Sequence, residues 1–157
     1  MHILLLGIGK TDFSFVREGM DEYSRRVRRY NPCTITFLTD IKNHGSLSHD
    51  EIKKREGHIL LQELLPTDSI VLLDVKGKHY HSLGFAEFIN KKMVAGHKRL
   101  VFIIGGAYGF SDEIYARAHD KLSLSAMTFS HQIVRLLFVE QLYRAFTILR
   151  NEPYHHE

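Results

Sequence analysis

Hydrophobic residues along this chain fall into short continuous runs separated by segments with helical spacing. The runs span residues 3–8, 69–75, 100–104 and 122–124, and residues 33–38 alternate between apolar and polar as a strand does. Strands that alternate with helices are typical of a largely parallel sheet. We therefore expect one α/β domain over residues 1–157, with a mostly parallel sheet and helices on both of its faces.

Short polar residues indicate where the helices begin. Ser48 is followed three positions later by Glu51, which matches the capping-box pattern, and the preceding stretch 42–50 is the most loop-like segment of the chain. The expected helices are 13–29 after a capping Asp12, 48–64, 85–94 capped from Ser82, 112–119 after Ser111, and 131–150.

The expected last helix is apolar on almost every side, so it is either central in the fold or part of a subunit interface. We favour an interface and hence a homodimer. His131 and Arg135 lie four positions apart at its start, a spacing that would direct a ring nitrogen and a guanidinium at one substrate. The alternative is a capping histidine and a solvated arginine.

Composition excludes several protein classes. The 157 residues are 44% hydrophobic and 25% charged, as in ordinary globular domains, and the single Cys33 cannot form an internal disulfide. Charged residues interrupt every apolar run before it reaches the roughly 18 residues of a membrane span, and the N-terminus does not match a signal peptide. We expect a cytoplasmic protein without a membrane association.

Basic clusters on the chain make contact with RNA phosphates plausible, although a charge run is more often a solvated face. The formal net charge is +3. The clusters are 23–30, 53–55 and 97–99.

The glycines near the N-terminus do not form a phosphate-binding motif. Gly9-Lys10-Thr11 ends like a Walker loop, but the glycine required five positions earlier is Leu4. Asp12 stands where a dinucleotide fingerprint needs its third glycine. We interpret this segment as an ordinary turn at the end of a strand.

A second glycine turn, residues 105–109, is a better candidate for a ligand site because a buried strand precedes it. Ligands of open α/β sheets bind beyond the carboxyl ends of the strands. The polar stretch 124–129 follows another strand end, and its backbone N–H and C=O groups could contact a purine between apolar side chains. These two segments would form opposite lips of one cofactor pocket. A turn required only for geometry is the alternative.

Histidines near residue 80 and at the C-terminus raise the question of a metal site. His79, His81, His155 and His156 have no carboxylate or cysteine companions at a recurrent spacing, so we expect no metal. The tail Tyr154-His155 could instead stack on a nucleobase and hydrogen-bond to it, if the rest of the protein orders it.

Taken together, these motifs resemble the RlmH-type ribosomal RNA methyltransferases, small members of the SPOUT class. The resemblance covers the whole chain. It rests on the Gly-Lys start, Glu56-Gly57, Ile-Gly-Gly-x-x-Gly at 104–109, Leu-Ser-x-x-Thr-Phe-x-His at 124–131, Glu-Gln-Leu-Tyr-Arg-Ala at 140–145, and the Pro-Tyr-His ending.

The resemblance implies a homodimer that binds S-adenosylmethionine beside a C-terminal trefoil knot and methylates N3 of a pseudouridine in 23S ribosomal RNA of assembled ribosomes. A SPOUT methyltransferase acting on tRNA and a non-catalytic RNA-binding or nucleotide-sensing module are the alternatives. Our own candidates for accepting the N3 proton or orienting the base are His131, Tyr154 and His155, and Arg135 would steer the phosphate or a base carbonyl. The positions similar to the cofactor contacts of the family are Leu73, Gly105, Leu124, Ser125, Ala126, Met127, Thr128 and Phe129.

Overall fold

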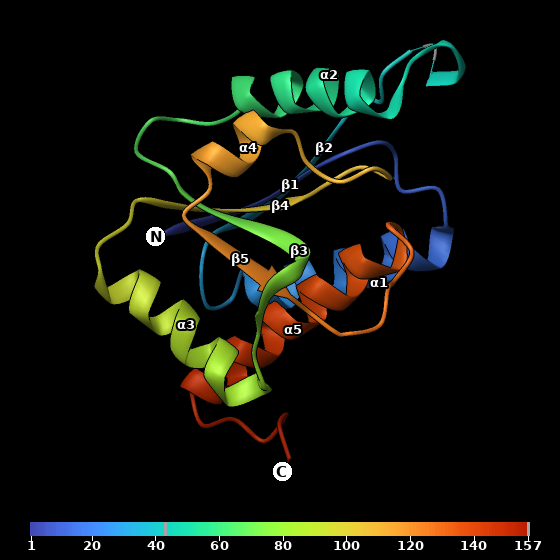
Figure 1. Cartoon of the computed structure of the whole chain (residues 1–157). Coiled ribbons are helices and arrows are strands. Elements are labelled where there is room, and N and C mark those ends of the chain that lie inside the picture. The colour runs from blue at the N-terminus through green and yellow to red at the C-terminus, as the bar shows by residue number, and fades with distance from the viewer. Residues whose placement is uncertain (43, 157) are drawn as a thin grey trace.

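The protein folds around a five-stranded sheet in which every strand pair is parallel (Figure 1). The computed structural model describes residues 1–42 and 44–156. The strand order is β2-β1-β4-β3-β5. The strands are β1 (His2–Ile8), β2 (Cys33–Leu38), β3 (Ser69–His79), β4 (Arg99–Ile104) and β5 (Asp120–Ser123). The α/β class and the parallel sheet predicted from the apolar runs are confirmed.

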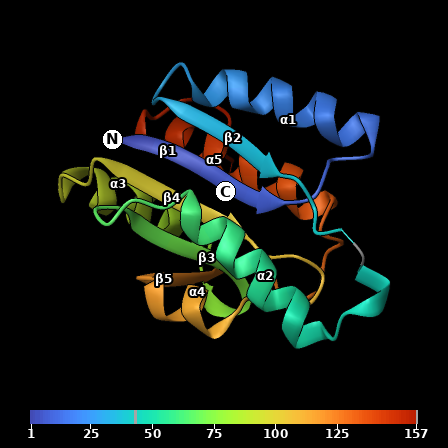
Figure 2. The same cartoon turned by 90° about the horizontal axis from the view of Figure 1, so that it is seen from above.

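Helices cover both faces of the sheet, as predicted (Figure 2). Helices α1, α3 and α5 lie on one face, with α5 packed against both of the others, and α2 and α4 lie together on the opposite face. The helices are α1 (Ser14–Val27), α2 (His49–Gln62), α3 (Ser82–Val94), α4 (Asp112–Arg117) and α5 (Ile133–Leu149), with a short 3-10 turn η1 (His44–Ser46) before α2.

The central strands carry apolar side chains on both faces and so contribute to two separate cores. Leu100, Phe102 and Ile104 point toward α1, α3 and α5, whereas Val101 and Ile103 point toward α2 and α4. Because side chains alternate along a strand, only a continuous apolar run can supply both layers. This is why the runs predicted strands so directly.

Two of the predicted helix caps are confirmed and two are wrong. Ser48 and Glu51 form the complete capping box of α2, and the Ser111 hydroxyl caps α4. Helix α1 instead begins after Phe13 without a side-chain cap, and the backbone N–H of Asp12 donates to Gln132 on α5. Helix α3 begins before its expected first turn, and His81 Nδ1 accepts from the N–H of Gly84. A histidine ring is an uncommon cap, so the sequence pattern favoured the neighbouring serine.

Helix α5 is central in the fold, which explains much of its apolar character. It packs between α1 and α3 and buries Phe138, Leu142 and Phe146 in the larger core. Within the described residues, no helix has both the length and the hydropathy needed to cross a bilayer. The stretch 42–50 was expected to be a loop, and part of it forms the η1 turn. Residue 43 of this stretch lies outside the described residues.

Candidate functional site

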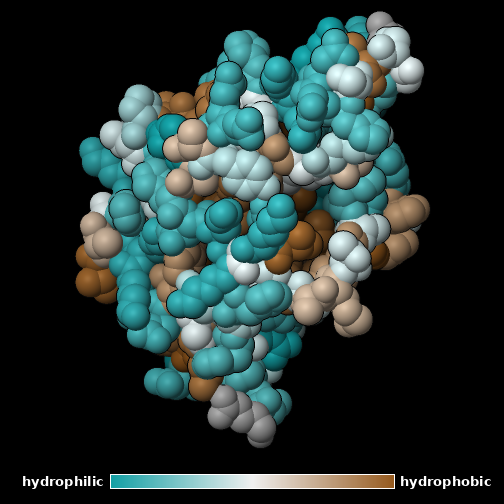
Figure 3. All heavy atoms as spheres, viewed as in Figure 1, coloured by the Kyte–Doolittle hydropathy of each residue, from teal (hydrophilic) through white to brown (hydrophobic). Residues whose placement is uncertain are grey.

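A pocket of about 570 Å³ opens beside the middle of β3 and beyond the carboxyl ends of β4 and β5. Residues 73–76 of β3 form one wall, and the segments that follow β4 and β5 form the others, because neighbouring parallel strands bring their carboxyl ends to one edge of the sheet. In Figure 3 this face of the molecule is hollowed beside β3, with hydrophobic residues exposed among hydrophilic ones. The lining comes from 73–76, 104–110, Tyr115, 122–125, 127–131 and Val134.

The glycine turn after β4 brings backbone, rather than side chains, to the pocket. Gly109 has a φ of +84°, a left-handed conformation that favours glycine, and its N–H donates to the C=O of Gly106 at 3.2 Å. A Cβ at Gly105 would lie 3.2 Å from the Phe110 ring. A Cβ at Gly106 would overlap the carboxylate of Glu56, which lies on α2 behind the turn. A side chain at Gly105 would require the Phe110 ring to shift by a few tenths of an ångström, and one at Gly106 would require the Glu56 carboxyl group to move.

The opposite lip is the segment after β5, which is held by its own serines. Ser123 Oγ donates to the C=O of Ser125 at 3.0 Å, and Ser125 Oγ accepts from the N–H of Met127 at 3.0 Å. The side chains of Met127 and Phe129 remain exposed at the mouth of the pocket. The lip thus combines an ordered backbone with exposed apolar side chains, as a cofactor site requires.

The structure brings together most of the residues that sequence reasoning assigned to the cofactor. Leu73, Gly105, and the stretch 124–129 except Ala126 line this one pocket. Ala126 is exposed at the tip of the lip and is not part of the lining.

Sequence reasoning missed an acidic and aromatic pair on the third wall. The hydroxyl of Tyr115 on α4 donates to Asp74 Oδ2 at 2.5 Å, and both residues line the pocket. Burial, together with this hydrogen bond, raises the pKa of Tyr115 to about 12, so the phenol stays protonated at neutral pH. No signal in the sequence joins positions 41 residues apart, because Asp74 lies within β3 and Tyr115 lies on α4.

The structure places His131 and Arg135 in different surroundings, although their spacing had suggested that both face one substrate. His131 is exposed and lines the pocket, but Arg135 is only 1% exposed. Its guanidinium donates to the C=O groups of Ile8, Gly9 and His131 and stacks on a ring at 4.0 Å, that of Phe37. Burial lowers the pKa of Arg135 from its usual value. The side chain therefore ties the β1–α1 turn to the start of α5 and does not point into the pocket.

The C-terminal tail lies away from this pocket in the same chain. Tyr154 packs on Tyr143 of α5, and its hydroxyl donates to Glu140 Oε1 at 3.0 Å and lies 3.2 Å from that of Tyr23. Burial first, and then these hydrogen bonds, raise the pKa of the Tyr154 phenol well above its usual range. Figure 1 shows the tail at the far end of α5 from the segments that follow β4 and β5. Neither Tyr154 nor His155 lines the pocket.

Comparison of the chain with known proteins shows its family. The sequence model described as "Predicted SPOUT methyltransferase" matches residues 1–155. The chain belongs to the SPOUT methyltransferase family. Full-length relatives within it are close: the Ribosomal RNA large subunit methyltransferase H of Flavobacterium johnsoniae is 52% identical over 157 residues, covering 100% of both chains. The protein of the same name from Parabacteroides distasonis is 51% identical over the same length. The resemblance inferred from the motifs is confirmed.

Solved structures of low sequence identity share the fold. A methylase family protein from Neisseria gonorrhoeae superimposes with a TM-score of 0.51 at 15% identity, covering 99% of this chain and 85% of that one. A probable methylase family protein from Haemophilus influenzae gives a TM-score of 0.50 at 11% identity over 99% of this chain and 70% of that one. The trefoil knot implied by the resemblance stays a prediction.

Proposed function

We propose that this SPOUT methyltransferase transfers the methyl group of S-adenosylmethionine to N3 of a pseudouridine in 23S ribosomal RNA of assembled ribosomes. The observation that carries the proposal is the pocket beside β3 and beyond the ends of β4 and β5, where the segments expected to bind a methyl donor meet. Full-length relatives about half identical to the chain are named ribosomal RNA large subunit methyltransferases, which supports the choice of substrate.

The residues of the pocket fit an adenosyl ligand. Its volume of about 570 Å³ lies within the usual range of cofactor sites. Backbone groups of Gly105 and of the lip 124–129 are available to a purine edge, and Met127 and Phe129 supply apolar contact. Asp74 is the acidic side chain of the lining and suits the ribose hydroxyls or the amino group of the ligand.

The donor supplies an electrophilic methyl group on a sulfonium, so the protein has to position the acceptor ring and manage the proton on its N3. His131 lies at the rim of the pocket with its ring exposed. We assign to this imidazole the acceptance of the N3 proton. Arg135 is a positioning residue, because its Nε donates to the C=O of His131 at 3.0 Å and fixes the backbone there.

A homodimer would allow the tail to reach a pocket, that of the second copy. Tyr154 and His155 lie outside the pocket of their own chain, and the 17 residues of α5 separate the tail from His131. A helix of this length measures about 25 Å. Two copies arranged about a two-fold axis could bring each tail to the other copy's pocket, where Tyr154 and His155 would contact the acceptor base. The exposed Met127 and Phe129 would then be covered.

Exposed basic residues are available for the RNA backbone. Some charges of the clusters are used within the fold, since Arg26 pairs with Glu22 and Arg99 with Asp68. Others, including Lys54 and Lys98, are exposed. We assign these to phosphate contacts, which predicts a strong dependence of ribosome binding on salt. Action on ribosomes would place the protein in the cytoplasm.

The test is methyl transfer from radiolabelled S-adenosylmethionine to three substrates: assembled ribosomes, free ribosomal RNA and tRNA. Label in ribosomes, with the modified nucleotide identified by mass spectrometry as N3-methylpseudouridine, is expected. Label confined to tRNA would support the tRNA enzyme, and donor binding without transfer to any substrate would support a sensing module. Either result would refute the proposal.

A matched pair of variants tests the proton acceptor. His131→Ala should lower kcat by about 10²-fold or more while leaving donor binding nearly intact. His97→Ala, at a half-buried position before β4, is the control. An unchanged pH profile and kcat in His131→Ala would remove this histidine from the mechanism.

A further inference from the structure

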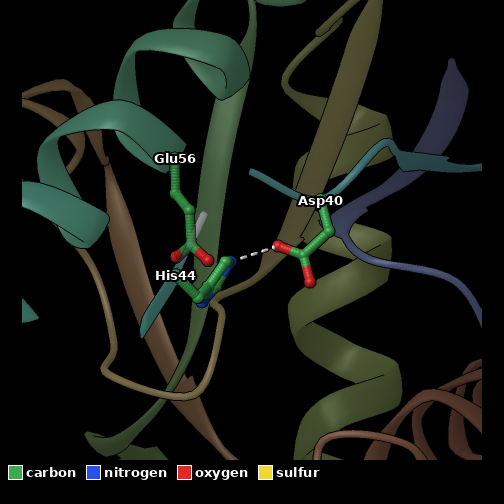
Figure 4. A group of neighbouring side chains, drawn as sticks. All are labelled: Asp40, His44 and Glu56. Carbon is green, nitrogen blue, oxygen red and sulfur yellow. Dashed lines mark hydrogen bonds and ion pairs between the residues drawn. The ribbon is translucent and has the colours of Figure 1, made fainter. Parts of the chain in front are cut away.

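A second group of chemically active side chains lies behind the glycine turn, outside the pocket (Figure 4). Asp40 follows β2, His44 begins the η1 turn, and Glu56 is in the middle of α2. One ligand atom from each residue can be chosen so that all three lie within 4.8 Å of one another. In Figure 4 the imidazole lies between the two carboxyl groups. Sequence reasoning missed this group, because its members do not have a recurrent metal-ligand spacing.

Glu56 is the unusual member of the group. Its side chain is only 4% exposed, and its Oε2 atom is buried without a hydrogen-bond partner. A buried carboxylate normally has its lone pairs satisfied, and an orphaned oxygen costs free energy. Burial, together with the nearby charge of Asp40, raises the pKa of Glu56 to about 7. The fold therefore buries Glu56 Oε2 where no group of the described structure forms a hydrogen bond with it.

The other two residues supply an approach from solvent. The side chains of His44 and Asp40 are 38% and 56% exposed, and His44 Nε2 lies 2.8 Å from Asp40 Oδ1. Asp40 Oδ1 also accepts from the N–H of Ile41 at 2.8 Å, which holds the carboxylate in place. A buried carboxylate on a helix and a solvent-facing histidine and aspartate on a short turn form a half-open site.

We propose that Asp40, His44 and Glu56 bind one divalent transition-metal ion, with Zn²⁺ the best match to two carboxylates and one imidazole. Zinc takes nitrogen and oxygen ligands at about 2.0–2.2 Å and completes its shell with water. Ligand atoms around such an ion are roughly 3.4 Å apart in tetrahedral geometry. In the structure His44 Nε2 and Asp40 Oδ1 are 2.8 Å apart and all three ligand atoms lie within 4.8 Å of one another, so the side chains would rearrange to surround an ion. Ion binding would replace the hydrogen bond between His44 Nε2 and Asp40 Oδ1.

The position of the site links it to the pocket. A Cβ at Gly106 would overlap the Glu56 carboxyl group, so the glycine turn rests directly on this side chain. His49, at the start of α2, stacks on Tyr108 of the same turn with ring centroids 3.9 Å apart. An ion that fixes Glu56 and the η1 turn should therefore restrict the motion of residues 105–109. This consequence concerns the fold and does not depend on the methyl-transfer reaction.

The test uses the full-length protein after treatment with a chelator. Titration with Zn²⁺ alone, followed by calorimetry, should give saturable binding of one ion per chain. Co²⁺ should produce visible absorption bands of a site with oxygen and nitrogen ligands. Glu56→Gln, which keeps the shape of the side chain, should weaken Zn²⁺ binding at least tenfold, and His44→Asn should do the same. A thermal melt of each variant shows that it is folded.

Two control variants separate this site from other histidines. His58→Ala removes an exposed histidine two residues from Glu56 on α2, and His156→Ala removes an exposed histidine of the tail. Both should bind Zn²⁺ like the parent protein. Absence of saturable binding to the parent, or equal binding by Glu56→Gln, would overturn the proposal, as would loss of binding in His156→Ala alone. Amide exchange of residues 105–109 should become slower on addition of Zn²⁺ in the parent and not in Glu56→Gln.

Discussion

Replacement of the buried Arg135 by methionine is the sharpest test of how the fold holds the entrance to the site. In the structure the guanidinium donates to His131 O at 3.0 Å, Gly9 O at 3.1 Å, Ile8 O at 2.8 Å and Thr11 Oγ1 at 2.8 Å. Methionine keeps much of the apolar stem but donates no hydrogen bond. The variant therefore removes the contacts while changing the packing little.

The expected loss of stability follows from these contacts. Hydrogen bonds from a charged donor contribute roughly 1.5–3 kcal/mol each, but the variant also removes the cost of burying the guanidinium. Since that cost offsets part of the gain, we expect a net destabilisation of about 3–5 kcal/mol. For a chain of this length, this corresponds to a decrease in the melting temperature of roughly 6–20 °C.

Thermal unfolding followed by circular dichroism measures this decrease. Arg150→Met is the matched control, because Arg150 is exposed at the end of α5 and its loss should change the melting temperature by no more than about 2 °C. If Arg135→Met melted within about 2 °C of the parent, the argument that Arg135 holds the β1–α1 turn would be refuted. A normal melting temperature combined with lost methyl transfer would point instead to direct contact with the substrate.

Three further predictions concern other parts of the fold. Asp68→Asn should destabilise the protein by about 3 kcal/mol at pH 7 in a urea titration, because it leaves the partly buried Arg99 unpaired. Burial acts to raise the pKa of Asp68, but hydrogen bonds from Arg99 outweigh this effect and lower the pKa. The stability that this carboxylate contributes is therefore present above pH 4 and is lost as the pH falls through the pKa of Asp68 in the folded protein. Parallel pH–stability curves of the parent and the variant below about pH 5 would contradict this. Gly77→Ala should lower the melting temperature by roughly 4 °C or more, because the new Cβ would lie 2.5 Å from the backbone nitrogen of Leu122, and an unchanged melt would exclude that clash. Cys33 is buried and burial raises its pKa to about 11, so alkylation by iodoacetamide at pH 8 should require unfolding; rapid labelling of the native protein would contradict this.

An element of the fold could be predicted from the sequence when the interactions that determine it lie within a few residues of one another. The strands β1 and β4 are buried on both faces, so their apolar runs were sufficient. The Ser48–Glu51 cap is decided within four residues and was found as a pattern. The second half of β3 was missed, because its exposed lysines do not look like a strand and its pairing with β5 resumes only after an irregularity.

The site divides in the same way. Gly105 and the lip 124–129 could be placed together, because parallel strands bring their carboxyl ends to one edge whatever the details of packing. The partners of Arg135 could not be found, since its hydrogen bonds to Ile8 and Gly9 span 127 and 126 residues. A helical spacing from His131 predicts only that two side chains share a face. It does not say whether that face is turned to a substrate or to the interior.

The arrangement around α5 is the reason why the proposed function includes a dimer. The start of α5 brings His131 to the pocket, and its other end carries the tail. The hydroxyl of Tyr154 contacts Tyr23 on α1 and Glu140 on α5. A single chain cannot bring both ends of a straight helix to one place. If the tail acts in methyl transfer, it must do so in the pocket of a second copy. Mixing an inactive His131→Ala chain with an inactive Tyr154→Phe chain should then restore up to about a quarter of the activity, because half of the dimers are mixed and each has one intact site. Absence of any recovery after subunit exchange, shown to be complete by mass spectrometry, would refute action of the tail in trans.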